Sequence, residues 1–136
     1  MTYGKLVPTP SKESQPYWDS ARDHALRLQK CSGCGAFRFP PSPVCPECWS
    51  RAFAWEPVSG RGKVYTFCTY RRLYHPGFAD DLPYVVAVIA LEEGPRLLSN
   101  VIDCRPEDLR CDMPVEIVYR DATDAVSLPL FRPARD

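Results

Sequence analysis

The residues in this sequence with the clearest chemical potential are four cysteines in two Cys-x-x-Cys pairs, separated by ten residues. A Cys-x-x-Cys turn places two thiolates on one side of the backbone, and two such turns complete a tetrahedral four-sulfur site. Because four protein thiolates leave no open position for water, such a metal is structural. We therefore expect a structural Zn²⁺ held by Cys31, Cys34, Cys45 and Cys48.

The same thiols allow two other readings. A rubredoxin-type iron centre uses the same ligand geometry, so an electron-transfer role stays open, although we expect zinc rather than iron. Thioredoxin-like redox chemistry would need one pair at a strand-to-helix junction, which two pairs in a Pro-rich loop do not match. Cys68, Cys104 and Cys111 have no histidine nearby in the sequence, and we expect ordinary buried thiols there.

A second group of residues mixes positive charge with aromatic rings, in the segment "RRLYHPGFADDLPY". The sequence has two histidines and no Gly-x-Ser-x-Gly, phosphate-cradling glycine loop or clear carboxylate pair. These features favour a binding or partner module over a free-standing enzyme, with no catalytic residue. The candidate contacts with a ligand or a partner are Arg61, Lys63, Arg71, Arg72, Tyr74, His75 and Phe78; alternatively, Tyr74 and Phe78 plug the end of a barrel.

Elements that would position these residues can be read from periodicity and turn residues. Ser14 and Pro16 are typical of a helix start, and "LRLQKC" alternates as a strand leading into the first cysteine pair. Strands are predicted from residue 60, at 83–91 (apolar on both faces, hence buried on both), at 96–103, at 113–120 and at 126–133. A single helical turn is expected over 105–110.

Five strands with a helical turn between the third and fourth match the OB-fold, a small Greek-key barrel. The predicted class is therefore mainly β: a short N-terminal helix, a small metal-binding knob that contains the four cysteines and a five-stranded OB-fold barrel. The expected units are the arm and helix (1–24), the metal-binding knob (25–55) and the OB-fold (56–136).

Composition fits an ordinary globular protein of 136 residues, 45% hydrophobic and 25% charged. The net charge is zero but unevenly spread: residues 1–75 carry 11 basic and 5 acidic groups, and residues 76–136 carry 6 and 12. No apolar run is long enough to cross a membrane, and the start does not resemble a secretory signal. We expect a cytoplasmic protein whose thiols stay reduced.

In combination, these elements resemble the DUF35 family, which joins a rubredoxin-like zinc ribbon to an acyl-CoA-associated OB-fold. The matching stretches are "PYWDSARDHALRLQKCSGCGAFRFPPSPVCPEC", "GRGKVYTFCTYRR", "HPGFADDLPYVVAVIALEEGPRLLSNV" and "PVEIVY". The resemblance implies an accessory subunit that stabilises or assists a thiolase-like enzyme, a hotdog-fold hydratase or an aldolase in acyl metabolism. The catalytic residues then belong to the partner, and the barrel can border the channel for the CoA thioester. One departure is Cys111, where relatives often have glycine.

A different class of function competes with that reading. Zinc ribbons and OB-folds also bind nucleic acids, and Tyr65, Phe67, Tyr70 and Tyr74 offer aromatic rings for base stacking. The pI near 6.7 argues against this alternative, because nucleic-acid binding calls for a basic surface. We therefore expect an enzyme subunit rather than a nucleic-acid-binding module.

Overall fold

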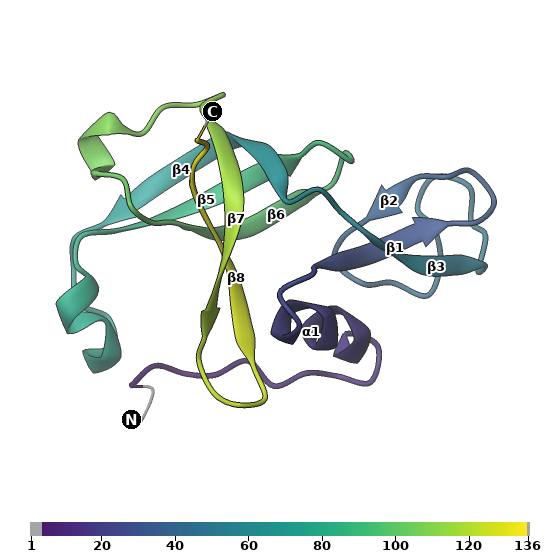
Figure 1. Cartoon of the computed structure of the whole chain (residues 1–136), viewed down its shortest axis with the longest axis horizontal. Helices are drawn as coiled ribbons and strands as arrows, with labels where there is room; N and C mark the ends of the chain where they lie inside the picture. The colour runs from purple at the N-terminus through teal and green to yellow at the C-terminus, as the bar shows by residue number, and fades with distance from the viewer. Residues whose placement is uncertain (1–3, 136) are drawn as a thin grey trace.

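The computed structural model describes residues 4–135. Figure 1 shows a β-barrel, a small separate sheet at its side and a helix below the two. The elements are α1 (Gln15–Arg22), β1 (Arg27–Cys31), β2 (Phe37–Arg38), β3 (Phe53–Pro57), β4 (Arg61–Tyr70), the 3₁₀ helix η1 (Pro76–Asp81), β5 (Tyr84–Leu91), β6 (Arg96–Val101), the 3₁₀ helix η2 (Pro106–Asp108), β7 (Pro114–Asp121) and β8 (Ser127–Pro133).

The barrel is closed, with strand order β4-β5-β6-β8-β7. All neighbours are antiparallel except β6 and β8, which are parallel and pair through Val101 and Phe131. The short helix η2 lies between the third and fourth barrel strands. The predicted mainly β architecture with a five-stranded OB-fold barrel is therefore confirmed.

Two glycines allow the long strand β4 to coil tightly into the barrel. Gly60 has a φ of 78°, and a Cβ at this position would collide with the side chain of Ile117. A Cβ at Gly62 would lie 2.6 Å from the carbonyl oxygen of Ala90 on the paired strand. Only glycine admits both close approaches, as the sequence predicts for a first barrel strand.

Strand β5 differs from the prediction that both of its faces are buried. Its residues alternate, with Val85, Ala87, Ile89 and Leu91 buried toward the barrel core and the intervening residues half-buried. An antiparallel barrel strand has one face in the core and one outside, whereas a strand covered on both sides belongs to a parallel sheet with helices on both faces. A purely apolar run cannot separate these two situations.

Helix α1 begins after Ser14, whose carbonyl oxygen accepts the amide of Trp18 at 3.1 Å, and contains Pro16 in its first turn as predicted. It ends at Arg22, and the left-handed φ of 58° at His24 turns the chain toward β1. The Nε2 atom of His24 lies 2.7 Å from a carboxylate oxygen of Asp121, so this connection is anchored to the end of β7. No helix within residues 4–135 has the length and apolarity of a membrane span.

The small sheet has the strand order β2-β1-β3. Its central strand β1 is the one predicted from the alternation before Cys31, whereas β2 and β3 have no comparable signal in the sequence. β2 contains only two residues, and β3 begins with three apolar residues in a row, so neither shows an alternation of apolar and polar residues. Pairing with β1 therefore determines both strands.

Candidate metal centre and contact surface

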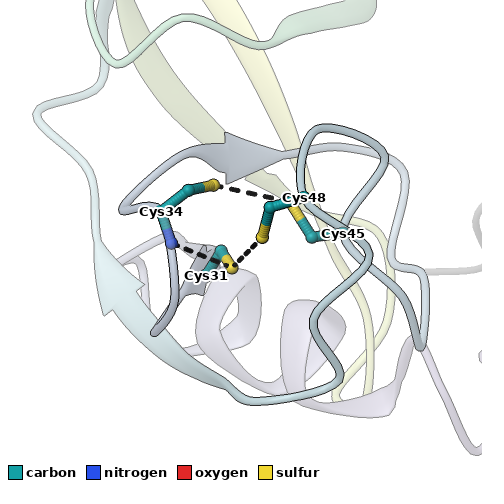
Figure 2. A group of neighbouring side chains, drawn as sticks. All are labelled: Cys31, Cys34, Cys45 and Cys48. Carbon is teal, nitrogen blue, oxygen red and sulfur yellow. Dashed lines mark hydrogen bonds between the residues drawn. The ribbon is translucent and has the colours of Figure 1, made fainter.

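The structure brings the four predicted cysteines together. Their Sγ atoms all lie within 4.8 Å of one another. The Cys31 and Cys48 sulfurs are 3.5 Å apart, and the Cys34 and Cys45 sulfurs are 3.7 Å apart. Figure 2 shows that the four side chains converge from the two turns on one point.

This arrangement fits a tetrahedral metal. Sulfurs bound to a central Zn²⁺ at 2.3 Å would be separated by about 3.8 Å, close to the two measured separations. A disulfide would require about 2.05 Å, and all seven cysteines are free. Cys31 and Cys45 are buried, whereas Cys34 and Cys48 are exposed. The four sulfurs therefore form a structural metal site of the zinc-ribbon type.

Backbone amides of the two turns point at the sulfurs. The N–H of Gly33 lies 3.3 Å from the Sγ atom of Cys31, and that of Cys34 lies 3.5 Å from it. Hydrogen bonds from these amides, the Cys34 amide foremost, lower the pKa of Cys31, and the amide of Cys48 acts likewise on Cys45. Since the thiolate is the form that binds metals, these turns prepare one sulfur of each pair for coordination.

The ribbon also contains a buried polar network that the sequence did not indicate. The Nε atom of Arg38 donates to the side-chain oxygen of Gln29 at 3.1 Å and to the carbonyl oxygen of Ser42, also at 3.1 Å. Its Nη2 atom donates to the same Ser42 carbonyl at 2.7 Å, and the Ser42 amide donates to Gln29 at 2.8 Å. The network thus joins β2 and β1 to the Pro-rich loop.

The predicted contact residues fall into two separate groups at opposite ends of β4. Arg61 and Lys63 lie at its start, and Arg71 with the following loop lies beyond its end. A ten-residue strand is about 30 Å long, so the groups do not share one small site. The side chains of Arg61, Lys63 and Arg71 are all exposed.

Aromatic rings stack at the far end of β4. Tyr84 stacks on Tyr70, with ring centroids 5.1 Å apart, and on Phe78, at 4.9 Å. Tyr74 is 70% exposed, with the guanidinium of Arg72 5.6 Å from its ring centroid. The alternative that Tyr74 plugs the barrel end is therefore wrong, whereas Phe78 is half-buried and borders a cavity of about 360 Å³.

The N-terminal arm reaches this loop, which the sequence did not indicate. The Nζ atom of Lys5 lies 2.6 Å from a carboxylate oxygen of Asp81 and 5.1 Å from the ring centroid of Phe78. A Cβ at Gly77 would collide with the backbone of Gly4. His75 stabilises the loop locally, because its Nδ1 atom accepts the amide of Gly77 at 3.0 Å.

At the start of β4, Arg61 and Lys63 border a hollow of about 880 Å³ between β4, the β5–β6 turn and β7. The hollow is mixed in charge, because Glu92, Asp112 and Glu116 line it as well.

The remaining cysteines differ from the expectation of buried thiols: Cys68 and Cys111 are exposed and Cys104 is half-buried. Cys68 points away from the core because it pairs with Val86 on the outer face of β5.

Two family models match the chain. Residues 18–54 match the rubredoxin-like zinc ribbon domain of ChsH2, and residues 55–120 match its C-terminal OB-fold domain. The boundary between the two matches falls within β3, on the way from the small sheet to the barrel. The small sheet and the barrel in Figure 1 thus each match a separate domain of ChsH2.

Several known proteins are similar over nearly the whole chain. The benzoylsuccinyl-CoA thiolase subunit BbsA of Thauera aromatica is 32% identical over 130 residues, 93% of this chain and 82% of that protein. A probable enoyl-CoA hydratase alpha subunit of Thermomonospora curvata is 36% identical over 129 residues. The match covers 93% of this chain but only 39% of that subunit, so the chain spans about two fifths of its length.

A solved structure is similar as well. It is described as the Ltp2-ChsH2(DUF35) aldolase, and its matching chain is 33% identical with a TM-score of 0.86. The match covers 95% of this chain and 100% of that chain. Ribbon and barrel therefore recur together, in one arrangement, in a chain of that aldolase.

Proposed function

Because the chain belongs to the DUF35 family, in which a zinc ribbon precedes an OB-fold, we propose that it is a non-catalytic subunit of an enzyme acting on CoA thioesters. The observation that carries this proposal is the likeness to BbsA, a thiolase subunit that this chain matches over most of both lengths. We therefore expect a thiolase-like partner, and the alternative partners are a hydratase or an aldolase. The partner supplies the catalytic groups.

Within this subunit, Zn²⁺ bound by Cys31, Cys34, Cys45 and Cys48 holds the ribbon together. The sulfur spacing supports this assignment, because it suits a tetrahedral ion of this size. With all four positions filled by protein, the ion has no place for substrate, so its contribution is to folding. Free thiols throughout the chain also support a reducing, cytoplasmic location.

The two ends of β4 provide the contacts with partner and substrate. The loop at its far end, with Arg71, Arg72, Tyr74, His75 and Phe78, presents exposed positive charge and an exposed aromatic ring. Such a surface suits either an aromatic group of a ligand or a partner subunit. Arg61 and Lys63, at the other end, border a hollow in which they can attract the phosphates of CoA.

Purification of the tagged full chain from its source organism, under reducing conditions, tests the proposed partnership. We expect a thiolase-like, hydratase or aldolase subunit to copurify in a constant ratio, and the complex to turn over a CoA thioester. Recovery of none of these, together with tight and salt-dependent binding of an oligonucleotide, would contradict the proposal.

Metal analysis of the same preparation tests the ion separately. We expect a colourless protein with about one zinc per chain, since one four-sulfur site binds one ion. A red preparation containing iron would contradict the assignment of zinc while leaving the proposed partnership intact.

A further inference from the structure

Arg38 is the most unusual charged residue of the ribbon. It is only 5% exposed, and within residues 4–135 it has no carboxylate partner. Its hydrogen-bond acceptors, in Gln29 and Ser42, are neutral, and its Nη1 atom is buried without a partner. Buried charges are normally paired, because their removal from water costs free energy that only an opposite charge offsets. The ribbon thus contains a buried positive charge without a visible counterpart.

The position of this charge relative to the sulfurs follows from the strand register. Arg38 pairs with Gln29 across β1 and β2, and Phe53 pairs with Cys31 across β1 and β3. Gln29 and Cys31 are two residues apart and both buried, so they lie on one face of β1, about 7 Å from each other. The guanidinium is hydrogen-bonded to Gln29 and lies 4.9 Å from the Phe53 ring centroid. It therefore lies on the same face of β1 as Cys31, against Gln29 on that strand and against Phe53, the cross-strand partner of Cys31.

A metal bound by the four cysteines would carry a charge of the opposite sign. Four thiolates around one divalent ion leave a net negative charge, which the buried surroundings must balance. We propose that Arg38 is a positioning residue of the metal centre that supplies this counter-charge. The inference rests on the proposed metal site but is independent of the proposed partner enzyme.

The hydrogen bonds of Arg38 add a geometric reason for the same role. Its guanidinium holds the carbonyl of Ser42, and the Ser42 hydroxyl donates to the carbonyl of Val44 at 2.9 Å, immediately before Cys45. Arg38 thus connects the strand that ends in the first cysteine pair to the loop that leads into the second. Groups that orient metal ligands from behind typically change metal affinity by about 10–100-fold when they are replaced.

Two substitutions separate the charge of Arg38 from its hydrogen bonds. Arg38→Lys keeps the charge but not the planar fork, whereas Arg38→Gln keeps an N–H donor for Ser42 without the charge. Arg27→Gln is the matched control, because Arg27 lies on the neighbouring strand β1, is exposed and donates to a backbone carbonyl, that of Trp55. Zn²⁺ affinity is measured on the reduced full chain by competition with a chromophoric chelator.

We expect Arg38→Gln to lower the affinity for Zn²⁺ by about 10–100-fold, Arg38→Lys to recover most of that loss, and Arg27→Gln to match the wild type. Wild-type affinity in Arg38→Gln would overturn the inference, and so would equal losses in both Arg38 variants, because the charge would then be irrelevant. A wild-type chain that binds no Zn²⁺ would instead overturn the metal site itself. Circular dichroism of each loaded variant verifies that the barrel is folded.

Discussion

At the scale of single residues, the ribbon contrasts with the other cysteines of the chain. The four sulfurs of the ribbon are clustered, and amides of their turns lower the pKa of Cys31 and Cys45, whereas Cys68 is exposed on the outside of a barrel strand. Clustering of the sulfurs, rather than burial, therefore distinguishes a ligand from an ordinary thiol here. Cys48 is exposed, yet its sulfur lies 3.5 Å from that of Cys31.

Replacement of one ligand tests this distinction. We expect Cys48→Ser to lower the zinc content from about one ion per chain to near zero, because three thiolates do not complete the tetrahedral site. Elemental analysis after dialysis against a weak chelator measures the effect. Cys68→Ser is the control for loss of a thiol, and a loss of zinc in that variant would contradict the assignment of ligands.

A carboxylate on the barrel makes the stability of the folded protein depend on pH. The pKa of Glu116 is lowered first by the amide of Arg135 and then by the side chain of Arg132, whose Nη2 atom lies 2.9 Å away. A carboxylate whose pKa is depressed on folding stabilises the protein above its ordinary pKa of 4.5, and this contribution disappears as the pH falls through the lower folded value. Glu116→Gln should therefore lower Tm at pH 7, and this effect should shrink as the pH is lowered toward 2.

Thermal unfolding at both pH values measures this difference. The control is Glu107→Gln, which removes an exposed carboxylate on η2. If Glu116→Gln lowered Tm equally at both pH values, the effect would arise from the lost side-chain geometry and not from the charge.

At the scale of elements, the structure depends on a few positions where backbones approach closely. β4 pairs with β5 along almost its whole length and with β7 at its start, so it must bend sharply between the two. The register shifts between Val64 and Thr66, which is typical of a β-bulge in a barrel strand. Gly60 and Gly62 precede this bulge, and their missing side chains provide the space for the neighbouring strands.

Gly62→Ala tests the close approach of β4 to β5. The added methyl group would lie 2.6 Å from the carbonyl oxygen of Ala90, and strand backbones in a closed barrel cannot move apart freely. We expect a loss of about 1–3 kcal/mol in the free energy of unfolding, measured by urea denaturation. Lys63→Ala, at the next and exposed position, should change it by less than about 0.5 kcal/mol. Equal effects would contradict the role of the glycine.

At the scale of the whole molecule, the ribbon and the barrel share one hydrophobic core. Helix α1 packs against both β8 and β1. Its buried residues Tyr17 and Ala21 belong to the same cluster as Leu28 of the ribbon and Phe131 of the barrel. The division of the chain into 1–24, 25–55 and 56–136 stays a prediction. The shared core indicates that α1 transmits structural changes between the ribbon and the barrel.

Removal of the metal tests how far the two parts are coupled. We expect a strong chelator to expose the ribbon amides of Gly35, Cys45 and Trp49, whose hydrogen bonds close the two turns, to rapid hydrogen exchange. Amides of β5, bonded on both sides within the closed barrel, should remain protected, while α1 loses part of its protection. Simultaneous loss of protection in β5 would mean that ribbon and barrel unfold as one unit.

Local chemistry and local periodicity determined a large part of this protein from its sequence. The spacing of the cysteines predicted a four-sulfur site, because a turn of four residues fixes how two thiolates are placed. Alternation and turn residues predicted all five barrel strands and η2. Both patterns extend over only a few consecutive residues, so they can be read directly from the sequence. The family resemblance added that the four-cysteine unit is a zinc ribbon and that the chain is an accessory subunit.

Only the tertiary structure decided what depends on distant pairing. Register across the small sheet places Arg38 beside Gln29 and Ser42, and chain reversal brings Lys5 to Asp81. The length of β4 separates Arg61 and Lys63 from the contact residues of the loop that follows the strand. Residues far apart in the chain meet through packing, whose energy is distributed over many weak contacts, so no short pattern of residues records these neighbours.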